Sequence, residues 1–344
     1  MKKIVKILLA LGLASGFISC SSSADGSSGP RIIEFGMWPQ THVDLSTEQI
    51  NGLTPTGRSI LNFDEYEDSN GNLYVKVTVD SEYDTRATGS DITFTTGIDC
   101  TGDETYYFKE EPIKWRVIDT AKGLIFAEKA ICGVGTIPYY GGTKRTLDEK
   151  TIYTSNWKYS NIRAWLNSKN NQFFTDGGTK TSYEVDYTNK GFITFAFTRE
   201  ERNIIRTTQL DNSLASVLDN DELMVQSGSY KNPTDYICED TEDKIFFLSN
   251  REITMYGFGK FDESAGPERI RGVSDFGKAT YALKLPDNPG DPRGCWWCTR
   301  SPSFKGEDAC ISGVASKGKN STGGVGDPTL SFIPAMCIDL AYIK

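Results

Sequence analysis

Apolar and polar positions alternate along much of this chain in short runs, which is the pattern of half-buried β-strands. The clearest run covers residues 74–79 and is entered through an Asn-Gly pair, which favours a hairpin turn. Residues 112–131 form two apolar runs around a glycine-containing turn and predict a second hairpin. A first strand is expected over residues 31–40, stopping at Pro39, because proline cannot donate a hydrogen bond to a β-ladder.

Signals for helices are fewer and local. Ser160 can cap a helix whose apolar side chains recur three and four residues apart. Capping boxes at residues 198–201 and 249–252 each open a further helix, and a brief helix is expected after Ser274. Residues 244–248 read as a short buried strand. Helices and strands follow one another without a βαβ rhythm, which predicts an α+β fold with a mixed or antiparallel sheet and a few short helices.

The first residues have the features of an export signal. Residues 1–19 contain three lysines, an apolar run too short to span a bilayer and a zone of small residues. Cys20 follows Phe-Ile-Ser, a context that resembles the lipobox of bacterial lipoproteins and implies a lipid on Cys20. An ordinary secreted protein with an incidental cysteine is the alternative. Residues 20–30 are rich in Ser and Gly and predict a flexible tether.

These features predict a cell-envelope protein held by lipid to a bacterial membrane, either on the outer membrane surface or in the periplasm. The whole chain carries a net charge of −9, and removal of a leader with three lysines makes it more negative. Nucleic acid is therefore excluded as a partner, since phosphate binding needs clustered Lys and Arg. With 12% aromatic and 38% apolar residues, residues 31–344 are expected to fold as one domain, with a β-rich insertion at 41–105.

Few residues suit catalysis or metal binding. His42 is the single histidine and lies in the insertion, so a Ser-His-Asp or Cys-His arrangement is not expected. Cys295 and Cys298 form a C-x-x-C pair, but there is no second pair to complete a zinc site. We therefore predict no catalytic residue, metal or cofactor. Paired carboxylates cannot be recognised without a structure, so an enzyme that acts on envelope glycans is kept as an alternative.

The C-x-x-C pair is also a poor redox centre, because the residues that follow it would start a helix badly. In a strand, Cys295 and Cys298 would project to opposite faces with Cα atoms about 10 Å apart, beyond the roughly 7 Å that a disulfide allows. We predict that they are not bonded to each other. Cys298, Cys310 and Cys337 are expected in one terminal sheet as a bridge or a buried thiol cluster, with reduced cysteines that act as small hydrophobes as the alternative.

A series of short motifs resembles a known family. The strings FGMWPQ, PIKWRVI, SNIRAWLN, FAFTREERNII, TTQLDN, DKIFFLSNREI, WWCTRSP and FIPAMCIDL resemble in order the bacterial DUF6273 domain, which is common in secreted and lipid-anchored proteins of spirochaetes and Gram-positive bacteria. The likeness runs from Arg31 to the end. Cys298 stands where the family prefers Leu, and Thr299 precedes the arginine.

From Trp296 onward the chain is also similar to C-type-lectin-like domains, which implies a single domain of that fold but no function. The resemblances and the residue types imply structural roles for Trp115, Trp165, Trp296, Arg300, Pro302, Pro334, Cys298, Cys310 and Cys337. The polar stretch between Pro302 and Phe332 suits adaptable contacts on a rigid sheet, although such stretches are usually solvated surface. The candidate binding residues are Trp297, Phe304, Lys305, Glu307, Asp308, Lys317, Lys319 and Asn320.

The hypothesis is therefore an anchored, non-enzymatic module whose C-terminal loops bind a host or envelope protein or glycan. The alternatives are the glycan-acting enzyme and a purely structural envelope module.

Overall fold

The computed structural model describes residues 29–81, 92–133, 144–170, 186–217, 235–259, 266–280, 294–304, 310–315, 317–327 and 330–343. The leader 1–19, Cys20 and most of the tether lie outside these residues. The described part is strand-rich with a few short helices, and its sheets are mainly antiparallel, so the α+β prediction is confirmed at that level. None of its helices is long and apolar enough to cross a membrane.

Among the described residues, the larger of two main sheets has nine strands. Its central hairpin joins β7 (Thr105–Asp119) to β8 (Leu124–Ala127), as the two apolar runs predicted. Gly123 forms the turn with a φ of +62°, and a side chain there would meet the Ile338 carbonyl. The other strands are β1 (Ile32–Val43), β2 (Thr54–Ile60), β3 (Phe63–Glu67), β4 (Leu73–Thr78), β13 (Ile205–Arg206), β16 (Ile245–Phe246) and β22 (Ala335–Ile338).

The strand predicted to stop at Pro39 is longer than expected. β1 continues through Pro39 to Val43 and pairs antiparallel with β7. The register shifts between Pro39 and Thr41, so the proline lies beside a β-bulge, where its missing N–H is tolerated. The expectation of a stop at this proline was wrong for that reason.

The second main sheet has five strands in the described part of the chain and contains the C-terminal motifs. Its strands are β10 (Cys132–Gly133), β21 (Ser331–Phe332), β18 (Trp297–Pro302), β19 (Cys310–Val314) and β20 (Asn320–Gly324). β18 is buried along its whole length between β21 and β19. The sequence NSTGG of β20, predicted as a loop, forms an edge strand on β19. Its polar residues suit an edge position, where one side of the strand needs no partner.

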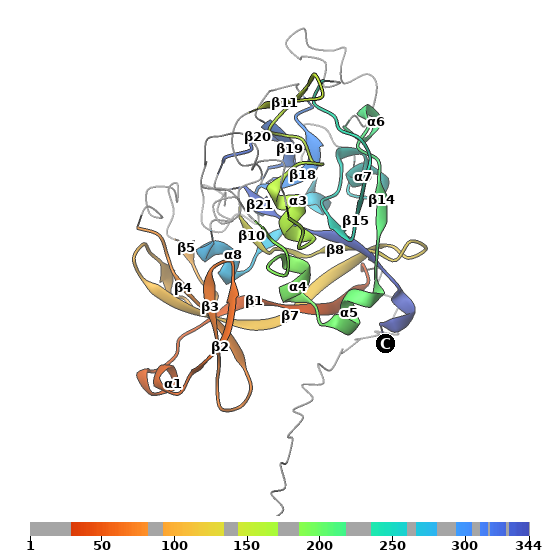
Figure 1. Cartoon of the computed structure of the whole chain (residues 1–344). Coiled ribbons are helices and arrows are strands. Elements are labelled where there is room, and N and C mark those ends of the chain that lie inside the picture. Colours follow the sequence, from red (N-terminus) through yellow and green to blue (C-terminus); the bar gives the residue numbers. More distant parts are fainter. Residues whose placement is uncertain are drawn as a thin grey trace, which may run out of the picture.

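Short helices pack on these sheets and begin at the predicted caps. Ser160 caps α3 (Asn161–Leu166), and both expected capping boxes are present. They open α5 (Arg199–Ile204) and α7 (Asn250–Met255), while α8 (Asp275–Ala279) follows Ser274. The remaining helical turns are α1 (Thr47–Asn51), α4 (Phe192–Ala196), α6 (Leu214–Val217), η4 (Pro267–Arg269) and η5 (Leu340–Tyr342). In Figure 1, α3 and α4 lie between β1 and β7 below and the β18–β20 strands above.

The smaller strands pair in twos: β5 (Ile92–Thr93) with β6 (Asp99–Cys100), β9 (Lys129–Ala130) with β17 (Gly272–Val273), β11 (Arg145–Leu147) with β12 (Lys150–Ile152), and β14 (Thr208–Leu210) with β15 (Thr241–Asp243). Buried tryptophans pack β1 and β7 of the nine-stranded sheet against each other and against α3 and α4. The Trp38 ring packs edge-on against Trp165 and Phe192, with centroids 6.2 and 5.0 Å away. Trp115 donates to the Phe35 carbonyl at 2.7 Å. Buried indole N–H groups are satisfied in this way, as a stable core requires.

Asp275 of α8 binds residues from the segment 41–105. Its carboxylate accepts from the backbone N–H of His42 at 3.2 Å and of Thr95 at 3.0 Å, and from Lys278. The ring of His42 is buried and stacks on Phe94 with centroids 4.6 Å apart. Burial, the largest influence, lowers the pKa of His42, so the ring is neutral in the core.

Candidate functional site

The predicted binding residues do not form one surface. Trp297 is 1% exposed and donates its indole N–H to the Arg269 carbonyl at 3.1 Å. It lies in β18, which is covered on both faces, so its assignment to a binding loop was wrong. Asn320 is also buried, at the start of β20. Phe304 packs partly against the core, whereas Lys317 and Lys319 are exposed. Lys305, Glu307 and Asp308 lie outside the described residues.

Arg300 has a structural environment. Its guanidinium is 2% exposed and pairs with both carboxylate oxygens of Glu252. It also donates to Asn212 Oδ1 at 3.1 Å, and to the carbonyls of Phe247 at 2.9 Å and Asp211 at 3.1 Å. These contacts use all the nitrogens of the side chain, so Arg300 joins β18 to α7 and has no donor left for a ligand.

The other predicted structural residues lie mostly in the interior. Trp115, Trp165, Cys298, Pro302 and Pro334 are buried. Trp296 and Cys310 are partly buried, and Trp296 packs against the core. Pro334 lies in the short segment between β21 and β22, where the chain passes from the five-stranded sheet to the nine-stranded one.

The cysteines form neither a bridge nor a single cluster. Cys295 and Cys298 have free thiols, which confirms that they are not bonded to each other. Cys337 is also a free thiol and lies in β22 of the nine-stranded sheet, so the expectation that it shares a sheet with Cys298 was wrong. Burial raises the pKa of both Cys295 and Cys298, which keeps the thiols protonated and unreactive.

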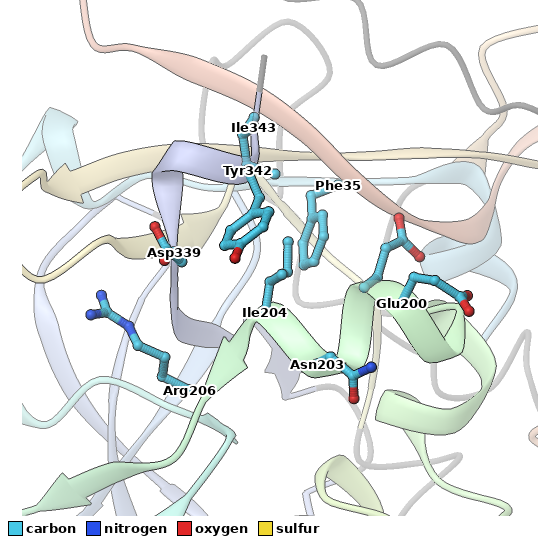
Figure 2. A pocket seen from close by; sticks show the side chains of 9 residues that line it. Phe35, Glu200, Asn203, Ile204, Arg206, Asp339, Tyr342 and Ile343 are labelled. Atoms are coloured by element: carbon cyan, nitrogen blue, oxygen red, sulfur yellow. The ribbon is translucent and has the colours of Figure 1, made fainter.

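A groove of about 600 Å³ lies between α5, β13 and η5, close to the C-terminal end. We call it the C-terminal groove. Its apolar side chains are Phe35, Ile204, Tyr342 and Ile343, and Figure 2 shows Tyr342 and Phe35 on opposite sides of Ile204. Tyr342 is 65% exposed, unusually high for a large aromatic residue in this chain. An exposed aromatic ring over apolar side chains is a common basis for recognition.

Charged residues line the two ends of the C-terminal groove. At one end Arg206 is already engaged, since it donates to the carbonyls of Lys122 and Ile338. Asp339 lies beside it and accepts from the backbone N–H of Ala341 at 3.1 Å. At the other end, Glu201 closes the capping box of α5, whereas Glu200 is exposed. The carboxylates of Asp339 and Glu200 therefore leave the groove acidic.

A second hollow of about 350 Å³ lies between β1, β7 and β9. Two motif segments meet there, since Trp38 and Gln40 come from FGMWPQ and Pro112 begins PIKWRVI. The amide of Gln40 donates to the carbonyls of Glu111 at 3.1 Å and Pro112 at 2.7 Å. These motif residues are engaged with one another and fix the bulged pairing of β1 with β7.

One pair of carboxyl groups is buried together. Glu65 on β3 and Glu110 on β7 are 1% and 5% exposed and hydrogen-bond each other. Arg58 Nε lies 3.2 Å from Glu65. Burial, and then the charge of Glu65, raise the pKa of Glu110 to about 8, so the pair holds one proton at neutral pH. Neither residue lines the groove or the hollow described above.

Sequence reasoning missed both the C-terminal groove and the acid pair. The groove is assembled from β1, α5, β13 and η5, which are far apart in sequence, so no local pattern marks it. The acid pair did leave a signal. In β7 the side chains of Tyr106, Phe108 and Glu110 alternate inward, which places a carboxyl group at a core position.

Within the described residues, no group of three or more His, Cys, Asp or Glu side chains is arranged to hold a metal ion. Comparison with curated proteins gave no match, and comparison with solved structures gave none either. A family described as "Domain of unknown function (DUF6273)" matches residues 124–340, from β8 to η5. The match covers more than half of the chain, and the chain belongs to the DUF6273 family.

Proposed function

We propose that the protein is a lipid-anchored, non-enzymatic binding module of the bacterial cell envelope, and that the C-terminal groove holds its ligand. The ligand is a short extended segment of another envelope protein that carries an aromatic or aliphatic side chain next to a basic one. The exposed ring of Tyr342 over the apolar side chains of the groove carries this proposal. The carboxylates of Asp339 and Glu200 at its two ends favour a basic neighbour in the ligand.

The position of the groove supports a partner in the envelope. Phe35, near the start of β1, lines the groove, so the tether joins the domain on this side. In Figure 1 the C-terminal end lies at this pole, while β19 and β20 lie at the opposite one. A flexible tether of about ten residues has a root-mean-square length of roughly 17 Å. Lipidation at Cys20 would therefore hold the groove close to the membrane surface.

The fold proposed with this function is a C-type-lectin-like domain. The α+β composition, the mainly antiparallel sheets and the terminal β18–β19–β20 meander support it. Such domains carry unrelated functions, so the fold adds no weight to a particular ligand.

The enzyme alternative would depend on paired carboxylates. The buried pair, Glu65 and Glu110, is in hydrogen-bond contact and lines neither the groove nor the hollow. Glycosidases keep their two carboxyl groups about 5 Å or more apart on either side of an open substrate site. This geometry favours a binding module.

A titration with synthetic peptides tests the ligand proposal. The probes are extended octapeptides with a central Lys-Phe pair, compared with Glu-Phe and Lys-Ala versions, and binding is followed by calorimetry. We expect Tyr342→Ala to weaken binding of the Lys-Phe peptide about tenfold or more. Asp339→Asn should weaken it less. The matched control is Lys319→Ala at the opposite pole, which should leave binding unchanged; loss of binding there, with none in Tyr342→Ala, would place the site on the terminal sheet.

The anchor is tested separately. Cells that express the full chain are fed an alkyne fatty acid, and the label is compared between wild type and Cys20→Ser. We expect label and detergent-phase partitioning in the wild type and neither in the variant. Label that persists in Cys20→Ser contradicts lipidation at this residue.

A further inference from the structure

A second buried arginine, Arg271, differs sharply from Arg300. Arg271 is 3% exposed, and its guanidinium carbon lies 5.0 Å from the ring centre of Phe126 and 4.9 Å from that of Phe258. Its Nη1 donates to the carbonyls of Glu268 at 3.0 Å and Ile270 at 2.8 Å. One corner of the guanidinium is thus held by the backbone, and the rings of Phe126 and Phe258, whose own centroids are 5.5 Å apart, pack together against the group.

The opposite edge of the guanidinium has no partner. Nε and Nη2 of Arg271 are buried and make no hydrogen bond with the described residues. The N–H groups of these two atoms point the same way and form the fork that binds one carboxylate through two parallel hydrogen bonds. Leaving such donors unsatisfied inside a protein is costly, and more so on a charged group.

Carboxylates near Arg271 do not fill the fork. Arg116 holds both candidates, with Nε 2.8 Å from Glu128 and Nη1 3.5 Å from Glu268. Burial, and then the like charge of Arg116, lower the pKa of Arg271 to about 10. That is the direction expected for a buried arginine whose counter-ion is too weak to offset its desolvation.

Another buried polar group lies in the same neighbourhood. The backbone N–H of Cys295 donates to the Arg271 carbonyl at 2.9 Å, and the Cys295 thiol interacts with both Arg271 and Ser331. The hydroxyl of Ser331 is buried. Among the described residues its contact is the Cys295 thiol, which is a weak hydrogen-bond partner. Two guanidinium donors and one hydroxyl donor therefore belong to residues that both interact with the Cys295 thiol.

We propose that the Nε–Nη2 fork of Arg271 binds one small planar oxyanion of the carboxylate or bicarbonate type, with the Ser331 hydroxyl as an additional donor. The two parallel donors of the fork match the two oxygens of a planar carboxylate-type group. Because the site is enclosed, the anion is bound as the chain folds and exchanges only by local opening. This site is separate from the C-terminal groove and does not depend on the proposed function.

Thermal unfolding after refolding in defined anions tests the site. The purified chain without its leader is refolded in Hepes, whose anion is too bulky to enter, with sodium formate or sodium bicarbonate added at constant ionic strength. We expect a rise in Tm of about 2 °C when the added anion reaches ten times its dissociation constant, and a further rise with the logarithm of its concentration. Chloride is the third probe, and a response to chloride equal to that to formate would overturn the assignment to an oxyanion.

Two variants and one control locate the response. Arg271→Lys keeps the charge but loses the fork, and should abolish the formate response. Ser331→Ala should fold and should need a several-fold higher formate concentration for the same rise in Tm. Arg300→Lys, at the satisfied arginine, should lower Tm yet keep the full response to formate. A wild type whose Tm does not rise with formate, or a Ser331→Ala variant with an unchanged rise, would refute the site as proposed.

Discussion

The domain buries charge in two different ways. In the five-stranded sheet, Arg300 is surrounded by Glu252, the Asn212 side chain and two backbone carbonyls, so its charge is balanced and its donors are filled. In the nine-stranded sheet, Glu65 on β3 and Glu110 on β7 are buried against each other with Arg58 beside them. The first arrangement lies within the residues matched by the family and the second lies outside them.

The difference shows what each arrangement costs. A buried ion pair with all its hydrogen bonds is stable at any pH where both partners stay charged, but removing one partner leaves the other buried and uncompensated. A buried pair of acids must instead retain a proton, so its contribution to stability changes with pH. Arg300 should therefore be sensitive to mutation, and the Glu65–Glu110 pair to pH.

The largest expected effect comes from breaking the satisfied arrangement. Arg300→Ala leaves the partly buried Glu252 and the buried Asn212 side chain without their donor, and should lower the free energy of unfolding by about 3 kcal/mol, measured by urea denaturation. Arg300→Lys keeps the charge but cannot bind both oxygens of Glu252 at once, so its loss should be smaller. A loss below about 1 kcal/mol in Arg300→Ala would mean that the network adds nothing to stability.

The next effect concerns the acid pair. The folded pKa of Glu110, about 8, lies above its ordinary value of 4.5, so the folded state binds more protons between these values. Stability should therefore fall as pH rises from 4.5 to 8, by up to about 1.4 kcal/mol per pH unit, and level off above 8. Glu110→Gln cannot ionise, so it should remove this dependence and be more stable than the wild type at pH 8 by about 2 kcal/mol.

The control for this experiment is Glu111→Gln, on the same strand. The carboxylate of Glu111 is on the other side of β7 and accepts from the Thr41 hydroxyl at 2.5 Å. The stability of this variant should follow the wild-type pH profile between 4.5 and 8. Equal pH slopes for Glu110→Gln and the wild type would show that Glu110 is not the group that retains the proton.

Local signals in the sequence predicted much of the fold. The caps at Ser160, Thr198, Ser249 and Ser274 and the hairpin turn at Gly123 were found because each depends on residues within a few positions. Tertiary context overrode two other signals. Pro39 is tolerated inside β1 because it lies beside a β-bulge, where the strand does not need its backbone N–H for pairing. The Gly/Ser-rich residues of β20 form a strand because they pair with β19 at the edge of the sheet.

The candidate sites were harder to predict because they depend on long-range packing. The sequence around Trp297 is compatible with an exposed binding platform and with a core position. The structure shows that it is a core residue, because β18 lies between two other strands. The difference between Arg300 and Arg271 is likewise invisible in sequence, since neither the position of Arg300 within β18 nor that of Arg271 just before β17 indicates the partners of its side chain. Only the partners brought by α7 show which of the two is satisfied.

The smallest expected effect is the difference in stability cost between removing the cap of α7, which belongs to the Arg300 network, and removing the cap of α5, which does not. Ser249 and Thr198 both accept from the N3 backbone N–H of their helices, at 3.2 Å in each case, and both boxes are closed by a glutamate. In α7 that glutamate is Glu252, which also binds Arg300, whereas Glu201 of α5 faces the C-terminal groove. Thr198→Ala should therefore cost about 1 kcal/mol, as an ordinary cap does.

Ser249→Ala should lower the free energy of unfolding by more, about 2 kcal/mol, because Ser249 is buried. Without the capping box, the carboxylate of Glu252 is also held less firmly in its position beside Arg300. In the background of Arg300→Ala this excess should disappear, and the two cap variants should then cost the same. The four free energies of unfolding form a double-mutant cycle that measures the coupling directly. An excess that survives in Arg300→Ala would show that the cap of α7 acts independently, and that the Arg300 network does not extend to the start of the helix.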